Sequence, residues 1–218
     1  MNIDGVTGSA AKYLRRKILT GEFRPGERLN EVALSSMLEI SRAPLREAFR
    51  ILERDRLVVS VPRKGCYVAE LSIADFIELF QTREMIECYA IDLLGQKEVR
   101  TIPHLESLLS STSAQPPQGS IDPQERLDYL EAVTSFHRLL VEASGNKRIL
   151  ALYEAIVSNV TRYQFIYFFR AEHKTDSREE HMAILDRLGK GEYQEAKALL
   201  RGHIRRFESL MRSLMHQA

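Results

Sequence analysis

From residue 71 to its end, the sequence carries only patterns that are typical of helices, and this restricts the fold more than any other feature. Apolar residues recur three and four positions apart in six segments, near 72–95, 100–111, 124–144, 147–171, 177–189 and 192–216. Ser177 with Glu180 resembles a capping box, and Gly145 and Gly189 suit helix C-termini. Six helices without a strand predict an all-α bundle.

The first 70 residues follow a different order. Three short helical segments come first, with Asn30 suited to cap the second and Pro44 tolerated in the first turn of the third. Two β-like stretches, 57–61 and 66–68, then flank the basic tip 62–65. We therefore expect a mainly α protein with two domains. Residues 1–70 would form a winged helix-turn-helix with a small β-hairpin wing, and residues 71–218 an all-helical bundle.

Charge is divided unequally between these two parts. The whole chain has a net charge of +1, but residues 1–70 hold 13 lysines and arginines against 9 acidic residues. A module that binds phosphates needs this local excess of positive charge. No apolar run approaches the roughly 18 residues that a membrane helix needs, and no secretion signal is evident. Cys66 and Cys88 match neither a disulfide framework nor a zinc spacing, so we expect a cytoplasmic protein with no membrane partner.

The third helical segment carries the pattern of a DNA-reading helix. Arg42, Arg46 and Arg50 are spaced four apart and share one face, and Leu45 and Phe49 occupy the opposite side. Such a helix can bury one face and place guanidinium groups in the major groove of DNA. A solvated basic face is the alternative, but the preceding helix and the basic tip favour DNA binding.

The segment LRRKILTGEFRPGERLNEVALSSMLEISRAPLREAFRILERDRLV and the following VPRKGCYVAEL resemble the GntR family of regulators. They are similar to the family pattern I..G...PG..L.E..LA..L.VSR.PVREAL..L...GLV. The resemblance implies binding to a double-stranded DNA operator. It places the DNA-contacting arginines at Arg42 and Arg46, with Ser41 and Ala43 beside them and Gly65 at the wing tip. We add Arg50, on the same helix face, and Lys64, in the basic tip, to the predicted DNA-binding residues. Two positions depart from the pattern, because Glu39 replaces a turn glycine and Ala43 replaces a threonine or serine.

Three histidines lie on the inner stripes of three predicted helices. They are His137, His181 and His203. Three inward imidazoles could converge on one metal ion, or each could be a hydrogen-bonded core residue. No inward carboxylate beside them is evident in the sequence.

The segments FQTREMIECYAIDLL, FHRLLVEASGN and EEHMAILDRLGKGEYQEAKALLRGHI resemble the FCD effector domain of FadR-type GntR regulators. Many such domains hold a divalent metal with one aspartate and three histidines, and the histidines match His137, His181 and His203. Val133 stands where the aspartate would fall. The resemblance thus implies a zinc, nickel or manganese site without its carboxylate.

The same resemblance implies a homodimer and a small organic acid as effector, bound by Arg83. Asn159 and Arg162 would line the same cavity. An inward arginine needs an anionic partner, and Glu87, one turn after Arg83, could supply it instead of an effector. The leading interpretation is a DNA-binding transcription regulator controlled by a small carboxylate, and not an enzyme. One alternative is a regulator whose helical domain only dimerises. Another is a metal-dependent hydrolase, which would leave the winged-helix segment unexplained.

Overall fold

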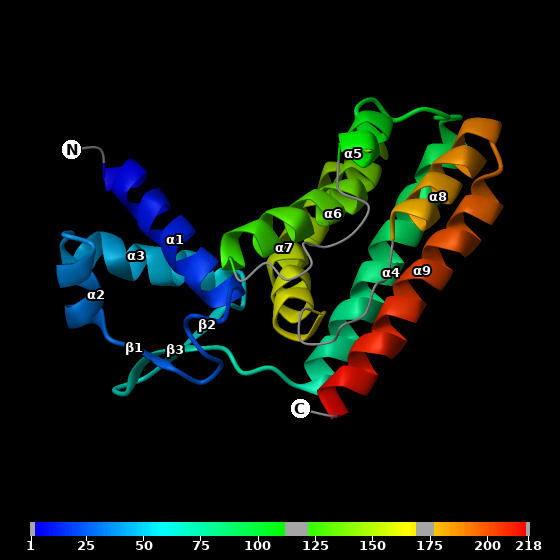
Figure 1. Ribbon diagram of the computed structural model, residues 1–218. Helices are drawn as coiled ribbons and strands as arrows, with labels where there is room; N and C mark the ends of the chain where they lie inside the picture. The colour runs from blue at the N-terminus through cyan, green and yellow to red at the C-terminus, as the bar shows by residue number, and fades with distance from the viewer. Residues whose placement is uncertain (1–2, 112–121, 169–176, 217–218) are drawn as a thin grey trace. The chain divides into compact units, whose positions relative to one another are not determined.

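The computed structural model describes residues 3–111, 122–168 and 177–216. The chain divides into two compact units, Met1–Ser72 and Ile73–Ala218 (Figure 1). Among the described residues, no helix is long and apolar enough to cross a membrane.

The first unit consists of three helices and a small antiparallel sheet. In chain order its elements are α1 (Ile3–Leu19), β1 (Arg28–Leu29), α2 (Glu31–Met37), α3 (Arg42–Arg54), β2 (Val58–Val61) and β3 (Gly65–Val68). The strand order is β1-β3-β2, so the predicted hairpin exists and gains a third strand, β1, which was not predicted. Asn30 caps α2 by accepting hydrogen bonds from the backbone N–H groups of Val32 and Ala33, as predicted.

The turn between α2 and α3 contains a residue in the left-handed region. Glu39, where the family pattern has glycine, has a φ of 53°. A side chain is disfavoured there because its Cβ crowds the following carbonyl oxygen. This position explains why a glycine suits the turn.

The second unit consists of helices alone over the described residues. They are α4 (Ile73–Gln96), α5 (Leu105–Ser111), α6 (Pro123–Ala143), α7 (Lys147–Tyr163), the π-helical segment η1 (Gln164–Phe168), α8 (Arg178–Lys190) and α9 (Tyr193–His216). The longest two, α4 and α9, lie side by side (Figure 1). Helices α6 and α7 pack together against α4, and α8 packs on α9. The predicted all-α bundle is confirmed.

Three details differ from the sequence-based prediction. Ser177 makes no side-chain capping bond to α8, so the predicted capping box is wrong. The carboxylate of Glu180 contacts His203 and Arg206 instead. Helix α8 also continues through Gly189 and ends at Lys190, and the following Gly191, with a φ of 77°, caps the helix as glycine commonly does. Finally, the segment predicted as one helix over 147–171 changes to π-helical geometry at Gln164, and residues 169–171 lie outside the described residues.

Candidate functional site: a basic recognition helix and a three-histidine cluster

Helix α3 has the two faces that the sequence predicts. Leu45, Ala48, Phe49 and Leu52 are buried in the core of the first unit. Arg46 and Arg50 point outward, with side chains 61% and 72% exposed. Arg42 and Ala43 are exposed in the first turn, directly after Ser41, the N-cap residue. The helix therefore keeps its arginines free of the core and available to a large polar partner.

Two acidic side chains contact these arginines. The Nε of Arg46 donates to Glu31 Oε2 at 2.9 Å, which joins the start of α2 to α3. Arg50 pairs with Glu47 on its own helix. The contact from Glu31 was not predicted, because fifteen residues separate it from Arg46.

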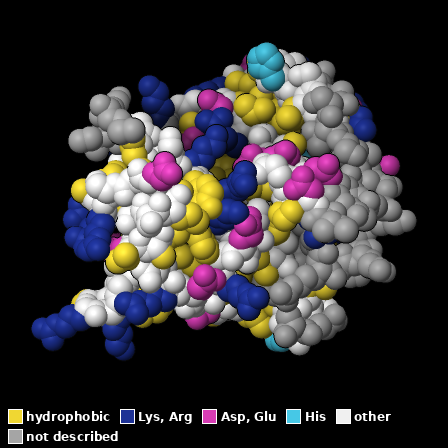
Figure 2. Space-filling view, turned by 60° about the vertical axis from the view of Figure 1, so that its left-hand side comes forward, with side chains coloured by type: hydrophobic (Ala, Val, Ile, Leu, Met, Phe, Trp, Pro, Cys, Tyr) yellow, Lys and Arg dark blue, Asp and Glu magenta, His cyan; other side chains and the backbone are white. Residues whose placement is uncertain are grey.

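The wing places Lys64 and Gly65 at the turn between β2 and β3, and both are exposed. Gly65 has a φ of 111°, which a residue with a side chain rarely adopts. Figure 2 shows Lys and Arg side chains on one face of the molecule, with both acidic and apolar side chains between them. Helix α3 and the wing thus contribute every residue that the sequence assigned to DNA contact.

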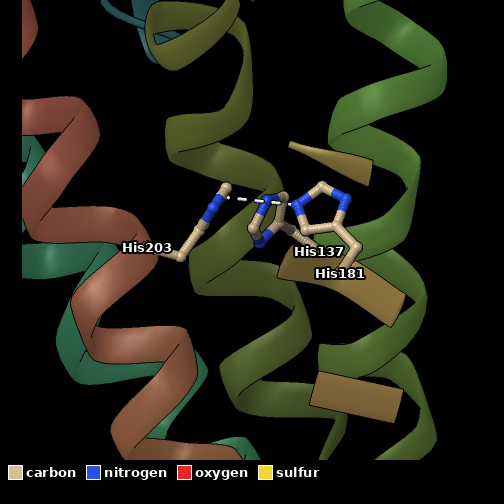
Figure 3. Close-up of side chains that lie close together, drawn as sticks. All are labelled: His137, His181 and His203. Carbon is tan, nitrogen blue, oxygen red and sulfur yellow. Dashed lines mark hydrogen bonds between the residues drawn. The ribbon is translucent and has the colours of Figure 1, made fainter. Parts of the chain in front are cut away.

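The second unit brings three histidines from three helices together. His137 of α6, His181 of α8 and His203 of α9 are all buried, and their candidate ligand atoms lie within 4.8 Å of one another (Figure 3). The Nε2 atoms of His181 and His203 are 3.4 Å apart. Phe136 stacks on His181, with ring centroids 3.9 Å apart. The predicted convergence of the three imidazoles is therefore observed.

Two of these imidazoles each have a carboxylate next to their Nδ1 atom. Glu87 Oε2 lies 2.7 Å from His137 Nδ1, and Glu180 Oε2 lies 2.6 Å from His203 Nδ1. The expectation that no inward carboxylate lies beside the histidines is wrong. Glu87 comes from α4, far away in the sequence, so the helical pattern around the histidines could not show it. Because each Nδ1–H donates to a carboxylate, each of these two rings keeps its lone pair on Nε2.

Burial favours the neutral forms of His137 and His181. It lowers the pKa of His137 well below its usual 6.5, and the proximity of Arg83 and His203 lowers it further. Burial likewise lowers the pKa of His181, with smaller effects from its two histidine neighbours. Neutral imidazoles carry the lone pairs that metal ligation requires.

A cavity of about 50 Å³ adjoins the cluster. Its wall is formed by Tyr129, Leu130, Val133, Gln164, Ser177, His203, Arg206, Phe207 and Leu210. Val133 thus presents an apolar surface to this space. A small molecule in this cavity could contact His203.

The three predicted effector residues lie elsewhere. Arg83 is buried on α4, and its Nε donates to Glu87 Oε1 at 2.7 Å, which is the alternative that the sequence left open. Arg162 is buried in the last turn of α7, and Asn159 is half-buried on the same helix. None of the three is among the described residues that line the cavity. Gln164, Ser177 and Arg206, which do line it, were not predicted as effector residues.

Comparisons with known proteins agree with this organisation. Residues 7–68 match the family described as bacterial regulatory proteins, gntR family, and residues 78–206 match the FCD domain. The chain is 29% identical over 192 residues to an HTH-type transcriptional regulator of Bacillus subtilis, YdhC, covering 87% of this chain and 84% of that protein. It is 30% identical over 184 residues to the Nta operon transcriptional regulator of Aminobacter aminovorans, covering 84% of each.

A solved structure has the same fold. It is described as a GntR transcriptional regulator from Rhodococcus sp. RHA1, with a TM-score of 0.74 and 24% identity over 95% of this chain and 97% of that one. The relatives are named as regulators and not as enzymes, which contradicts the hydrolase alternative. The chain belongs to the GntR family and is a DNA-binding transcriptional regulator with an FCD domain.

Proposed function

We propose that this regulator binds a double-stranded DNA operator through residues 1–70. A small organic acid binds residues 71–218 as its effector, next to a divalent metal ion bound in the same part of the chain. The exposed arginine face of α3 carries the first part of this proposal. Arginine can pair bidentately with guanine or grip phosphate, and the wing supplies Lys64 and Gly65 beside it.

The donor set of the second unit fits a metal ion. Two nitrogens bound tetrahedrally at about 2.0–2.1 Å are about 3.3–3.4 Å apart. The Nε2 atoms of His181 and His203 have a separation of 3.4 Å. Carboxylates behind His137 and His203 fix the ring orientation, as they commonly do around metal-bound histidines.

The three-histidine set favours particular metals. Imidazole suits zinc and nickel, whereas manganese prefers oxygen ligands. Because Val133 supplies no oxygen, we propose zinc or nickel in preference to manganese. A bound ion would give the site positive charge, and this charge would attract an acid into the adjoining cavity.

We also propose that the protein acts as a homodimer. Winged helix-turn-helix regulators read two half-sites about one helical turn of DNA apart, which requires two copies of α3. An effector that changes their spacing would change operator affinity, and this is how the acid would act on transcription.

DNA binding is tested with Arg46→Ala. Wild-type protein would select its preferred sites from a random double-stranded DNA library, and affinities for selected and scrambled sites would be compared at fixed salt. We expect Arg46→Ala to lose about 5- to 150-fold of this preference, the range for one good bidentate base contact. Arg24→Ala, an exposed arginine in a turn of the same unit, is the matched control. Equal preference in the wild type and Arg46→Ala would contradict the assignment of Arg46.

Metal binding is tested by elemental analysis of tag-free protein purified without chelator. We expect close to one zinc or nickel ion per chain, absent in His181→Ala. His216→Ala removes an exposed histidine at the end of α9 and should keep the metal. No metal in the wild type, even after zinc and nickel are added, would contradict this part of the proposal and leave DNA binding unaffected.

A further inference from the structure

The short strand β1 presents an arginine on the outer face of the wing. Leu29 of this strand is buried, whereas Arg28 is exposed. Arg28 pairs with Tyr67 of β3, so its side chain lies on the same face of the sheet as that of Tyr67. Gly65, two residues earlier in β3, lies on this face too. Arg28 was not predicted to contact DNA, because β1 itself was not predicted.

The guanidinium of Arg28 lies against the tip of the wing. A Cβ atom at Gly65 would be 3.4 Å from Arg28 Nε and 3.6 Å from Arg28 Nη2, so the guanidinium is a neighbour of the turn backbone. Arg63 and Lys64 are exposed in that turn, which is closed by the hydrogen bond from Lys64 N–H to Val61 O at 3.0 Å. Three long cationic side chains therefore project from one narrow turn and the strand beside it.

The three cationic side chains of the wing have no carboxylate partner among the residues that the structure describes. Glu27, next to Arg28 in the chain, accepts from the backbone N–H of Arg24 at 2.8 Å. Elsewhere in the first unit, carboxylates pair with Arg15, Lys17, Arg46 and Arg50. Like charges repel, so a cluster without its own carboxylates is stabilised by an anionic partner. The wing therefore fits a polyanion.

The width of the wing favours the minor groove of DNA. An α-helix with its side chains is about 10–12 Å across, so α3 needs the major groove, which is about 12 Å wide. The minor groove is about 6 Å wide and can admit single extended side chains. Where runs of A·T pairs narrow this groove, its negative potential increases and attracts arginine. A guanidinium suits such a place because it is more weakly hydrated than an ammonium group.

We propose that Arg28 enters a narrow, A·T-rich minor groove beside the bases that α3 reads, and that it gives the regulator a preference for A·T pairs there. Gly65 supports this placement, because a side chain at its position would compete with the guanidinium for space. The inference rests on the proposed operator binding by residues 1–70. It adds a base-pair preference and the residue that creates it.

The experiment compares the sites that the full chain selects from a random double-stranded DNA library. The wild type should enrich A·T pairs beside the base pairs that Arg46 selects. Arg28→Gln should lose this enrichment and keep the selection by Arg46. Its affinity for the wild-type site should fall about fivefold or more, the usual cost of one mismatched base pair. Arg24→Gln makes the same change of charge at another exposed position of this unit and should keep the enrichment.

A modified base separates the minor groove from the major groove. Replacing adenine by 2,6-diaminopurine adds an amino group in the minor groove and leaves the major-groove edge unchanged. In the selected site, this replacement should weaken wild-type binding about fivefold or more. Arg28→Gln should lose less affinity, because the side chain that the amino group displaces is already missing. Thermal unfolding of Arg28→Gln should match the wild type, since Arg28 is exposed and Leu29 provides the buried contact of the strand.

The outcomes distinguish this inference from the proposed operator binding. The inference is overturned if the wild type enriches no A·T pairs, or if Arg28→Gln enriches them equally. Equal sensitivity of both proteins to diaminopurine would overturn it too. A uniform loss of affinity for all sequences in Arg28→Gln would have the same meaning, because it indicates a contact to phosphate alone. In each of these cases, site selection by α3 stands. Selection of no preferred site by the wild type would contradict the proposed operator binding as well.

Discussion

Replacing Glu87 by glutamine should destabilise the second unit severely, because Glu87 is the shared partner of two buried groups. It is fully buried, Arg83 is 1% exposed, and the contacts to Arg83 Nε and His137 Nδ1 are both 2.7 Å. Removing one partner of a buried ion pair leaves an uncompensated charge and typically costs 3–5 kcal/mol. We therefore expect the free energy of unfolding to fall by about 3–5 kcal/mol, a large part of the 5–15 kcal/mol of an ordinary domain.

The same substitution should weaken metal binding by a second route. Glutamine can offer its oxygen to Arg83, but its NH₂ group would then face His137 Nδ1. A nitrogen that faces a donor must accept, so His137 would move its proton to Nε2 and lose the lone pair that binds the metal. Loss of such a supporting contact commonly lowers metal affinity by about 10- to 100-fold.

Urea denaturation followed by far-UV circular dichroism measures the first effect, and zinc competition with a chelating dye measures the second. Glu84→Gln is the matched control on the same helix, since Glu84 is partly exposed and pairs with Arg201 and Arg205. Surface pairs of this kind contribute about 1 kcal/mol or less. If Glu87→Gln cost no more stability than Glu84→Gln, the reasoning about a buried charge would be refuted.

Three further predictions concern pH, the fourth ligand and the recognition turn. Burial lowers the pKa values of His137 and His181, so below about pH 6.5 the unfolded chain takes up protons that the metal-free folded protein does not. The free energy of unfolding should therefore fall as the pH drops below about 6.5, by up to about 2.7 kcal/mol per pH unit. Urea midpoints at pH 7.5 and 5.5 measure this fall, and His216→Gln, at an exposed histidine, should leave the pH dependence unchanged. Val133→Asp adds a carboxylate beside the cluster and should raise the affinity for manganese more than for zinc, measured by chelator competition; an unchanged metal preference would contradict the role given to Val133. Glu39→Gly relieves a left-handed backbone and should stabilise the turn by up to about 1 kcal/mol, seen as slower amide exchange in α2 and α3; faster exchange would show that the residue is not strained.

The helices could be predicted because apolar residues recur at regular intervals along their sequences. The apolar stripe of α3 placed its arginines on the outer face, and the stripes of α6, α8 and α9 placed three histidines inward. Periodicity of this kind is local, so it can be read without knowing which helices pack together.

What the sequence did not show depends on contacts between distant segments. Strand β1 has only two residues and forms because β3 lies beside it. Ser177 and Glu180 have the spacing of a capping box, but the partners of Glu180 come from α9. Gln164 lies where helical periodicity itself changes, so no stripe could assign it to the cavity.

The position of the buried Glu87 along α4 matters for how a movement of that helix changes the position of its first residue. The helix begins at Ile73, directly after the last residue of the DNA-binding unit, and Glu87 lies fourteen residues further along. At 1.5 Å per residue, this is a rigid arm of about 21 Å. A tilt of about 5° around Glu87 would therefore displace the start of the arm by about 2 Å, comparable to the helix shifts through which regulated proteins switch. Because Phe76 and Phe80 are buried on the same arm, such a tilt would also move the packing of α4 within the bundle.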